Sequence, residues 1–199
     1  MLILAKTVLG IMLGFIISLI AGLIIIPILR KKKLGQQTCK LINDRHIKKE
    51  GTPTIGGLIF IIPTIISILL LYFKGSLKFN HNLIILIFVF ISYGLLGYVD
   101  DMLKIKRHNN EGISIKIKFI VQLLIAIIFY FIYKYNGGLT DLTISLFGFK
   151  LQMGYFFGIF ILFLLVGTTN AVNITDGLDG LCGGLSVMAF LSYGVIAWG

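Results

Sequence analysis

Four polar residues stand at three-residue steps between two long apolar segments of this 199-residue chain. They are Asn170, Asn173, Asp176 and Asp179, within the stretch NAVNITDGLDGL. An Asn side chain offers both hydrogen-bond donors and acceptors, whereas an ionised Asp only accepts. This mixture suits a nucleotide base with its ribose hydroxyls, or a metal ion with the groups around it. Helix capping is the simpler explanation, but it accounts for one or two of these residues rather than for all of them.

The glycines around these residues favour a turn or a close backbone approach over a regular helix. In an α-helix, each three-residue step rotates by about 60° relative to the last, so the polar residues cannot share one narrow face. A 3₁₀ segment would align them. The glycines concerned are Gly177, Gly180, Gly183 and Gly184.

Asp100 and Asp101 form a second candidate site, because they directly follow the mostly apolar run 82–99. Adjacent carboxylates repel each other, and each is costly near hydrocarbon unless a cation lies close by. Lys104 stands at the helical spacing that lets it pair with either one, if the helix continues. An ion pair at the helix end and a Mg²⁺ site are both open, since Mg²⁺ is bound through one or two carboxylates with waters and substrate phosphates.

The stretch HIKKEGTPTIGG, residues 46–57, holds a third group of polar residues. Gly56 and Gly57 permit a close backbone approach or a positive φ, Thr54 supplies a hydroxyl, and Lys49 stands just before. The stretch could wrap a phosphate, although it lacks the spacing of a P-loop. A plain turn at the entry of a helix explains it equally well.

The elements that position these residues are membrane helices. Only 13% of the residues are charged, against about 25% in soluble domains, and the mean hydropathy is +0.99. Several apolar runs approach the ~20 residues that span a bilayer. We therefore predict an all-α, polytopic membrane helix bundle that forms a single domain over 1–199. The predicted spans are about 2–29, 54–73, 82–99, 117–135, 153–172 and 181–198.

The distribution of charge indicates how the chain crosses the membrane. A net charge of +10 could suggest nucleic acid, but eight of the 18 basic residues lie between Arg30 and Lys49 and five more between Lys104 and Lys118. Such clustering in alternate loops is typical of the positive-inside rule and argues against a nucleic-acid partner. It predicts an N-terminus outside and cytoplasmic loops at about 30–53, 100–116 and 173–180, so that all three polar stretches face one compartment.

The first span carries small residues at four-residue steps, which allow helix backbones to approach closely in lipid. A contact between subunits and packing within one subunit are both open, and we favour packing. The residues are Gly10, Gly14, Ser18 and Gly22.

Together the three polar stretches closely resemble the phospho-N-acetylmuramoyl-pentapeptide transferases, of the polyprenyl-phosphate hexose-1-phosphate transferase superfamily (glycosyltransferase family 4 type). The resemblance rests on HIKKEGTPTIGG, on the aspartate pair after GYV and on NAVNITDGLDGL, and their order and spacing match across essentially the whole chain. The third stretch is specific for the superfamily. GTPTIGG indicates the muramoyl-pentapeptide branch, with Ile55 in place of the usual methionine.

The resemblance implies a reaction in a bacterial plasma (inner) membrane, with the active site on the cytoplasmic face. Phospho-N-acetylmuramoyl-pentapeptide would pass from its UDP-linked precursor to undecaprenyl phosphate with release of UMP, using Mg²⁺, in the first membrane step of peptidoglycan synthesis. The implied partners are these two substrates and the lipid bilayer, and a homodimer is left open.

The resemblance also implies roles for individual residues. Asp100 is the candidate base or positioning group for the lipid phosphate, and Asp101 would bind or orient Mg²⁺, with Asn173 as a further metal ligand. Asn170 is expected to be a supporting, structural member, and Lys118 with Gln122 matches a further basic position near the lipid phosphate. The residues expected to bind the nucleotide-side substrate are Lys49, Thr54, Lys104, Asn173, Asp176 and Asp179.

Members of this family run to about ten spans. They carry a third essential aspartate after the sixth span and a histidine cluster near the ninth. Because residues 1–199 end before both, we expect an N-terminal part that is inactive by itself. A sister transferase that moves N-acetylglucosamine-1-phosphate, a transporter and a non-catalytic membrane remnant are the alternatives.

Overall fold

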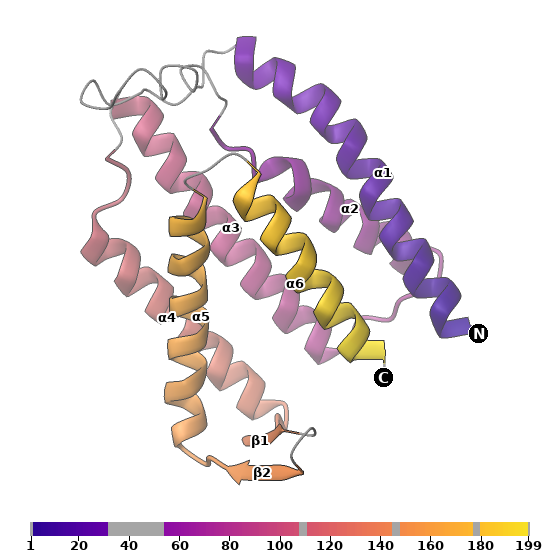
Figure 1. Cartoon of the computed structure of the whole chain (residues 1–199), viewed down its shortest axis with the longest axis vertical. Helices are drawn as coiled ribbons and strands as arrows, with labels where there is room; N and C mark the ends of the chain where they lie inside the picture. The colour runs from indigo at the N-terminus through magenta and orange to yellow at the C-terminus, as the bar shows by residue number, and fades with distance from the viewer. Residues whose placement is uncertain (1, 32–53, 108–110, 145–147, 177–179, 199) are drawn as a thin grey trace. The chain divides into compact units, whose positions relative to one another are not determined.

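The computed structural model describes residues 2–31, 54–107, 111–144, 148–176 and 180–198. Most of them are helical, and four helices (α1, α3, α4 and α5) are long and apolar enough to cross a membrane. The helices α2 and α6 are apolar but shorter, so the described residues support four of the six predicted spans by length and composition. Figure 1 shows the elements in chain order: α1 (Leu2–Lys31), α2 (Leu58–Phe73), α3 (His81–Arg107), α4 (Ile115–Tyr135), β1 (Asp141–Ile144), β2 (Phe149–Gln152), α5 (Phe156–Thr175) and α6 (Leu181–Trp198).

The chain divides into two compact units, Met1–Val121 and Gln122–Gly199, each of which is described by itself. In the first unit α2 lies along α1 (Figure 1). A Cβ atom at Gly10 would lie 3.6 Å from Leu71 Cδ1, and one at Gly22 would lie 3.5 Å from Ile59 Cγ2. Gly10 and Gly22 therefore pack against α2 of the same chain, as the prediction of packing within one subunit requires, whereas a Cβ atom at Gly14 would meet no described atom within 4 Å.

Helix α3 begins where Asn80 Oδ1 accepts a hydrogen bond from the backbone N–H of Leu83 at 2.8 Å. It continues to Arg107, beyond the predicted span 82–99, because neither glycine nor proline interrupts residues 98–107. The basic residues of its last turn also suit the negative end of the helix dipole. Asp100 and Asp101 consequently stand on the helix itself, at the spacing from Lys104 that side-chain pairing requires.

The second unit contains a short antiparallel hairpin between α4 and α5, which the all-α prediction did not include. Strands β1 and β2 pair from Asp141 with Gln152 to Ile144 with Phe149. Lys150 Nζ lies 3.0 Å from Asp141 Oδ2, so an ion pair joins the two strands. Both strands, DLTI and FKLQ, alternate polar and apolar residues, but at four residues they stand at the lower length limit of a pattern that predicts a strand.

Asn170 lies in α5, as the predicted span 153–172 requires, whereas the predicted turn at Asn173 is wrong because that residue lies in α5 as well. The apolar residues of 171–174 carry the helix on to Thr175, and the glycines begin only after that point. Asp176 follows as the C-terminal cap, and its backbone N–H donates to Val172 O at 3.1 Å. Among the glycines of this stretch that the structure describes, Gly180 has a positive φ of 80°, as a turn there requires.

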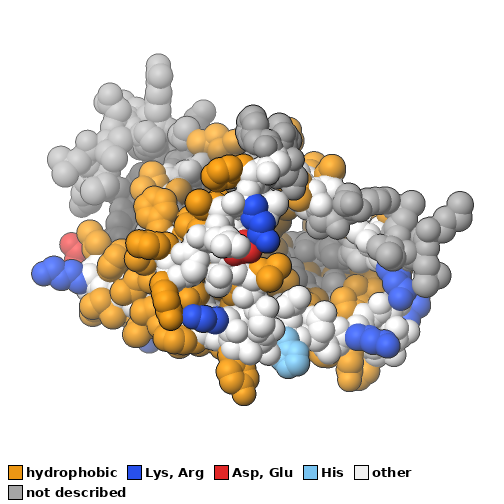
Figure 2. Space-filling model, turned by 90° about the horizontal axis from the view of Figure 1, so that it is seen from below, with side chains coloured by type: hydrophobic (Ala, Val, Ile, Leu, Met, Phe, Trp, Pro, Cys, Tyr) orange, Lys and Arg blue, Asp and Glu red, His pale blue; other side chains and the backbone are white. Residues whose placement is uncertain are grey.

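The surface of the helices is strongly apolar. Many large hydrophobic side chains are exposed, among them Phe73 at 80% and Phe163 at 78%. Figure 2 shows hydrophobic side chains over much of one face, with lysines and arginines at separate points. A soluble monomer rarely exposes so much contiguous apolar surface, whereas a bilayer covers it. The chain is therefore a multi-pass membrane protein.

The contact between α4 and α5 near the hairpin predicts the effect of adding a side chain. A Cβ atom at Gly158 would lie 3.0 Å from Tyr130 Cζ. Gly158→Leu should lower the free energy of unfolding by about 1–3 kcal/mol, the usual cost of overpacking. Gly167→Leu, in the same helix with no neighbour near its Cβ position in the described structure, should leave stability unchanged or raise it. Thermal unfolding in detergent measures both, and equal effects would contradict this packing.

Candidate functional site

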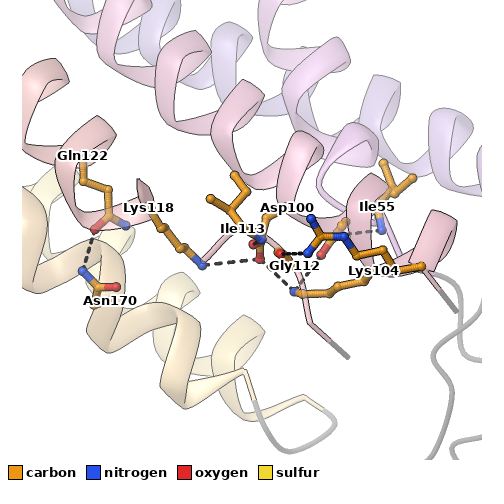
Figure 3. Close-up of polar contacts among 10 residues, drawn as sticks. Ile55, Asp100, Lys104, Gly112, Ile113, Lys118, Gln122 and Asn170 are labelled. Atoms are coloured by element: carbon orange, nitrogen blue, oxygen red, sulfur yellow. Dashed lines mark hydrogen bonds and ion pairs between the residues drawn. The ribbon is translucent and has the colours of Figure 1, made fainter. Parts of the chain in front are cut away.

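Asp100 is the most buried charged side chain that the structure describes, with 8% of that side chain exposed. Its Oδ2 lies 2.8 Å from Lys104 Nζ and 3.4 Å from Lys118 Nζ. Its Oδ1 accepts a hydrogen bond of 2.8 Å from the backbone N–H of Ile113, in the segment before α4 (Figure 3). Two cations and one backbone dipole thus replace the water that a carboxylate loses on burial.

Asp101 is the more open member of the pair, with 32% of its side chain exposed. Its Oδ1 accepts from Lys104 Nζ at 3.2 Å, and its Oδ2 accepts from the backbone N–H of Ile55 at 3.1 Å. Lys104 therefore contacts both carboxylates, which confirms the prediction that it can pair with either one. With Lys118 included, the cluster holds two negative and two positive charges, so its formal charge is zero.

The turn that brings Ile55 to Asp101 is strained. Ile55 has φ = 66°, in the left-handed region that a β-branched residue rarely adopts. Gly56 and Gly57 would permit a positive φ, but Gly57 has φ = −56° and neither glycine has a positive φ. Such a conformation costs about 1–3 kcal/mol and persists where surrounding contacts determine it. Here the buried Ile55 side chain and the N–H bond to Asp101 are two such contacts.

Gly112 closes the other side of the cluster, and sequence reasoning missed it. A Cβ atom there would lie 2.7 Å from Asp100 Cγ and 3.0 Å from Asp100 O, so only glycine fits without a shift. The Arg107 guanidinium donates to Gly112 O at 3.0 Å and ties this segment to the end of α3. The available signal was a lone glycine eleven residues after Asp101, which does not by itself reveal what it contacts.

In the second unit, an amide pair joins α4 to α5. Asn170 Nδ2 donates to Gln122 Oε1 at 2.8 Å and to Val166 O at 2.8 Å (Figure 3). Gln122 is fully buried. Asn170 thus has the supporting role that was expected of it. Asn173 and Asp176 are exposed at the end of α5, and their side chains form no hydrogen bonds within the described part of the chain.

The structure brings together Asp100, Asp101, Lys104 and Lys118, and places the buried Thr54 directly before Ile55. Asn173 and Asp176 belong to the second unit. Lys49 and Asp179 lie outside the described residues.

The oxygen atoms of Asp101 fit a hard cation such as Mg²⁺. Each accepts one N–H hydrogen bond, which leaves lone pairs for a ligand, and the side chain is partly exposed. Asp100 fits less well, because Oδ2 already faces two ammonium groups. Within the described ranges no three His, Cys, Asp or Glu side chains gather around one point. A site centred on Asp101 would therefore resemble the usual Mg²⁺ arrangement of one carboxylate with waters and phosphate oxygens.

Comparison with known proteins gives consistent matches. The profile described as Glycosyl transferase family 4 matches residues 83–199. The chain is 40% identical over 188 residues to phospho-N-acetylmuramoyl-pentapeptide-transferase of Bacillus subtilis, covering 94% of this chain and 58% of the relative. The protein of the same name from Listeria monocytogenes is 43% identical over 185 residues, covering 93% and 57%. The one from Geobacillus thermodenitrificans is 40% identical over 191 residues, covering 96% and 59%. The chain thus spans less than two thirds of the length of these relatives.

The close approach at Gly112 predicts a large effect from one methyl group. Gly112→Ala should displace the Asp100 carboxylate or the segment that carries Ile113, and lower the free energy of unfolding by about 1–3 kcal/mol. Gly97→Ala is the matched control, because it lies on an exposed position of α3 with open space around it. The control should be neutral or gain up to about 1 kcal/mol from better helix propensity. Equal stability of the two variants would show that Gly112 does not hold Asp100.

The ion pairs predict that replacing Lys104 costs more stability than replacing Lys150. Lys104→Met leaves two adjacent carboxylates without their shared cation and should destabilise the protein by about 2 kcal/mol, below the 3–5 kcal/mol of a fully buried pair because Lys104 is 31% exposed. Lys150→Met breaks the hairpin pair, whose lysine is 60% exposed, and should cost less than about 1 kcal/mol. Chemical denaturation of both variants measures the difference, and the reverse order would contradict the account.

Proposed function

Because the chain belongs to glycosyl transferase family 4, we propose that it transfers phospho-N-acetylmuramoyl-pentapeptide from its UDP-linked precursor to undecaprenyl phosphate, with release of UMP. The observation that carries the proposal is the cluster of Asp100, Asp101, Lys104 and Lys118, which holds two cations beside two carboxylates near the end of a membrane helix. The relatives that share about 40% of the sequence carry the name of this activity.

The reaction brings a lipid phosphate and a soluble diphosphate together, and like charges resist that meeting. Two unit charges 4 Å apart repel by about 4 kcal/mol near a protein surface. Fixed cations that face the reacting phosphates offset this repulsion and stabilise charge that develops during transfer. We assign Lys118 to the lipid phosphate and Lys104 to the nucleotide side; their ammonium groups lie 3.4 Å and 2.8 Å from Asp100 Oδ2.

Of the two roles considered for Asp100, the geometry favours positioning. Its Oδ2 faces both Lys104 and Lys118 and its Oδ1 accepts from the backbone N–H of Ile113, so three of the roughly four acceptor sites of the carboxylate are occupied and its main part is to hold the two lysines in place. Asp101 is the candidate Mg²⁺ ligand, with the amide oxygen of Asn173 as a further candidate. When bound, Mg²⁺ would supply charge neutralisation at the diphosphate.

The nucleotide side of the proposal rests on exposed polar groups. Asn173 and Asp176 stand at the end of α5 with their side chains accessible, and they offer the donor and acceptors that a nucleoside requires. We assign the same ligand to Thr54 and Lys104, and to Lys49 and Asp179 outside the described residues.

The proposed topology has six spans, an N-terminus outside and cytoplasmic loops at about 30–53, 100–116 and 173–180, in a single transmembrane domain of a bacterial plasma membrane. The basic last turn of α3, with Lys104, Lys106 and Arg107, supports a cytoplasmic end for that helix. A homodimer is compatible with this arrangement.

An assay of transfer tests the proposal. The chain, continued by the C-terminal part of the Bacillus subtilis relative, is supplied with undecaprenyl phosphate, Mg²⁺ and either the UDP-muramoyl-pentapeptide or UDP-N-acetylglucosamine. We expect lipid-linked product and UMP from the first donor. Product from the second donor alone would favour the sister transferase, and no product from either would favour the non-catalytic alternative.

A pair of variants in that assay tests the assignment of Asp101. Asp101→Asn removes the negative charge and should lower the rate by about 100-fold or more, as the loss of one electrostatic group at a reacting centre does. Asp141→Asn makes the same chemical change in the hairpin, where Asp141 pairs with Lys150, and should retain the activity. Equal rates for the two variants would remove Asp101 from the site.

A further inference from the structure

Helices α4 and α5 are joined by side-chain contacts at two levels. Near the hairpin, the rings of Tyr133 and Phe157 stack with centroids 5.8 Å apart. Toward the other end, Asn170 Nδ2 donates to Gln122 Oε1 at 2.8 Å (Figure 3). The first contact is apolar and close to the covalent connection, whereas the second is polar and lies 13 residues farther along α5.

Gln122 is an unusual residue for its place. Its side chain is fully buried, and one turn later Ile125 and Ala126 of the same helix are buried as well. Burying an amide in an apolar environment is costly unless it is hydrogen-bonded. Apolar contacts tolerate sliding, but a hydrogen bond is lost when its atoms move by about an ångström. The pair therefore specifies how α5 lies on α4, while the second bond of Asn170, to Val166 O, fixes the orientation of the amide.

The Gln122–Asn170 pair lies close to the C-terminal end of α5, so the packing that it fixes also determines where that end lies. Asn173 is one turn beyond Asn170, and Asp176 caps the helix. From Phe157 to Asn173 the helix measures about 24 Å at 1.5 Å per residue. A tilt of about 5° around the hairpin contact would move Asn173 by roughly 2 Å, and a 1 Å misplacement of a binding group can cost about 100-fold in rate.

We propose that Gln122 is a positioning residue, which holds the C-terminal turn of α5 through its hydrogen bond with Asn170. Asn173 and Asp176 are thereby kept in the position in which they bind their ligand. The identity of that ligand as the nucleotide rests on the proposed function. The holding of the helix end does not depend on it, so the two claims are tested by separate measurements.

Hydrogen exchange tests the holding of the helix end in the chain reconstituted in nanodiscs. Gln122→Leu removes the amide and keeps a similar volume. We expect amide exchange over residues 171–176 to become at least about tenfold faster, as loss of an interhelical polar contact allows. Gln152→Leu, the same chemical change on an exposed position of β2, should leave that exchange unchanged. Unchanged exchange in Gln122→Leu, or equal acceleration across α1 and α2, would overturn the proposal.

A reciprocal exchange of the two amides separates direct pairing from general loss of packing. Gln122→Asn and Asn170→Gln should each accelerate exchange at the end of α5, because each changes the reach of one partner. The double variant restores one long and one short amide and should return exchange to within about twofold of the original, a non-additivity that direct partners show. Additive effects in the double variant would overturn the pairing.

Titration with UDP tests the link to the ligand. Gln122→Leu should weaken UDP binding at least about fivefold, Gln152→Leu should not, and the double variant should recover most of the affinity. If Gln122→Leu binds UDP as the original chain does although exchange is faster, the positioning role for the ligand is overturned. If the original chain binds no UDP while exchange responds as expected, the nucleotide assignment fails and the holding of the helix end stands.

Discussion

The contact on which the candidate site depends is the bridge that Lys104 forms between Asp100 and Asp101. Two adjacent carboxylates near the end of an apolar helix repel each other and lose hydration, and one cation within 3.2 Å of both relieves the two costs together. Every other contact of the cluster follows from that arrangement. Lys118 approaches the inner carboxylate, while the backbone of Ile113 and Ile55 satisfies the oxygens that the lysines leave.

The helices and the contacts of Lys104 were predictable, because they depend on residues close together in the sequence. Apolar runs placed the helix ends to within four residues, except the C-terminal end of α3, which lies eight residues beyond the predicted span. The three- and four-residue steps to Lys104 predicted its contacts once α3 continues. The amides of Ile55 and Ile113 were not predictable. They are backbone donors, which no residue type reveals, and Ile55 is 46 residues from Asp101 in the chain. The strain at Ile55 was not predictable either, because the neighbouring glycines are the residues that adopt a positive φ most readily.

The stretch from Asn170 to Asp179 shows where composition misleads. Its glycines suggested a turn throughout, yet α5 continues to Thr175 because its apolar residues continue. In a regular helix the side chains of Asn170 and Asn173 leave the axis in directions that differ by about 60°. The first turns toward Gln122 and the second is exposed, so the two asparagines of one motif have different surroundings. Residue type alone could not divide these roles, because both residues are asparagines with the same hydrogen-bonding groups.

The central claim is that Lys104 and Lys118 form the phosphate-facing side of the cluster, and lysine modification measures it most directly. The chain in nanodiscs would be reductively methylated with and without a polyprenyl phosphate, and each lysine quantified by mass spectrometry. We expect the lipid phosphate to slow modification of Lys118 severalfold, to affect Lys104, which is assigned to the nucleotide, less than Lys118, and to leave the hairpin residue Lys150 unchanged. Modification of Lys118 at the same rate with and without the lipid phosphate would contradict the claim.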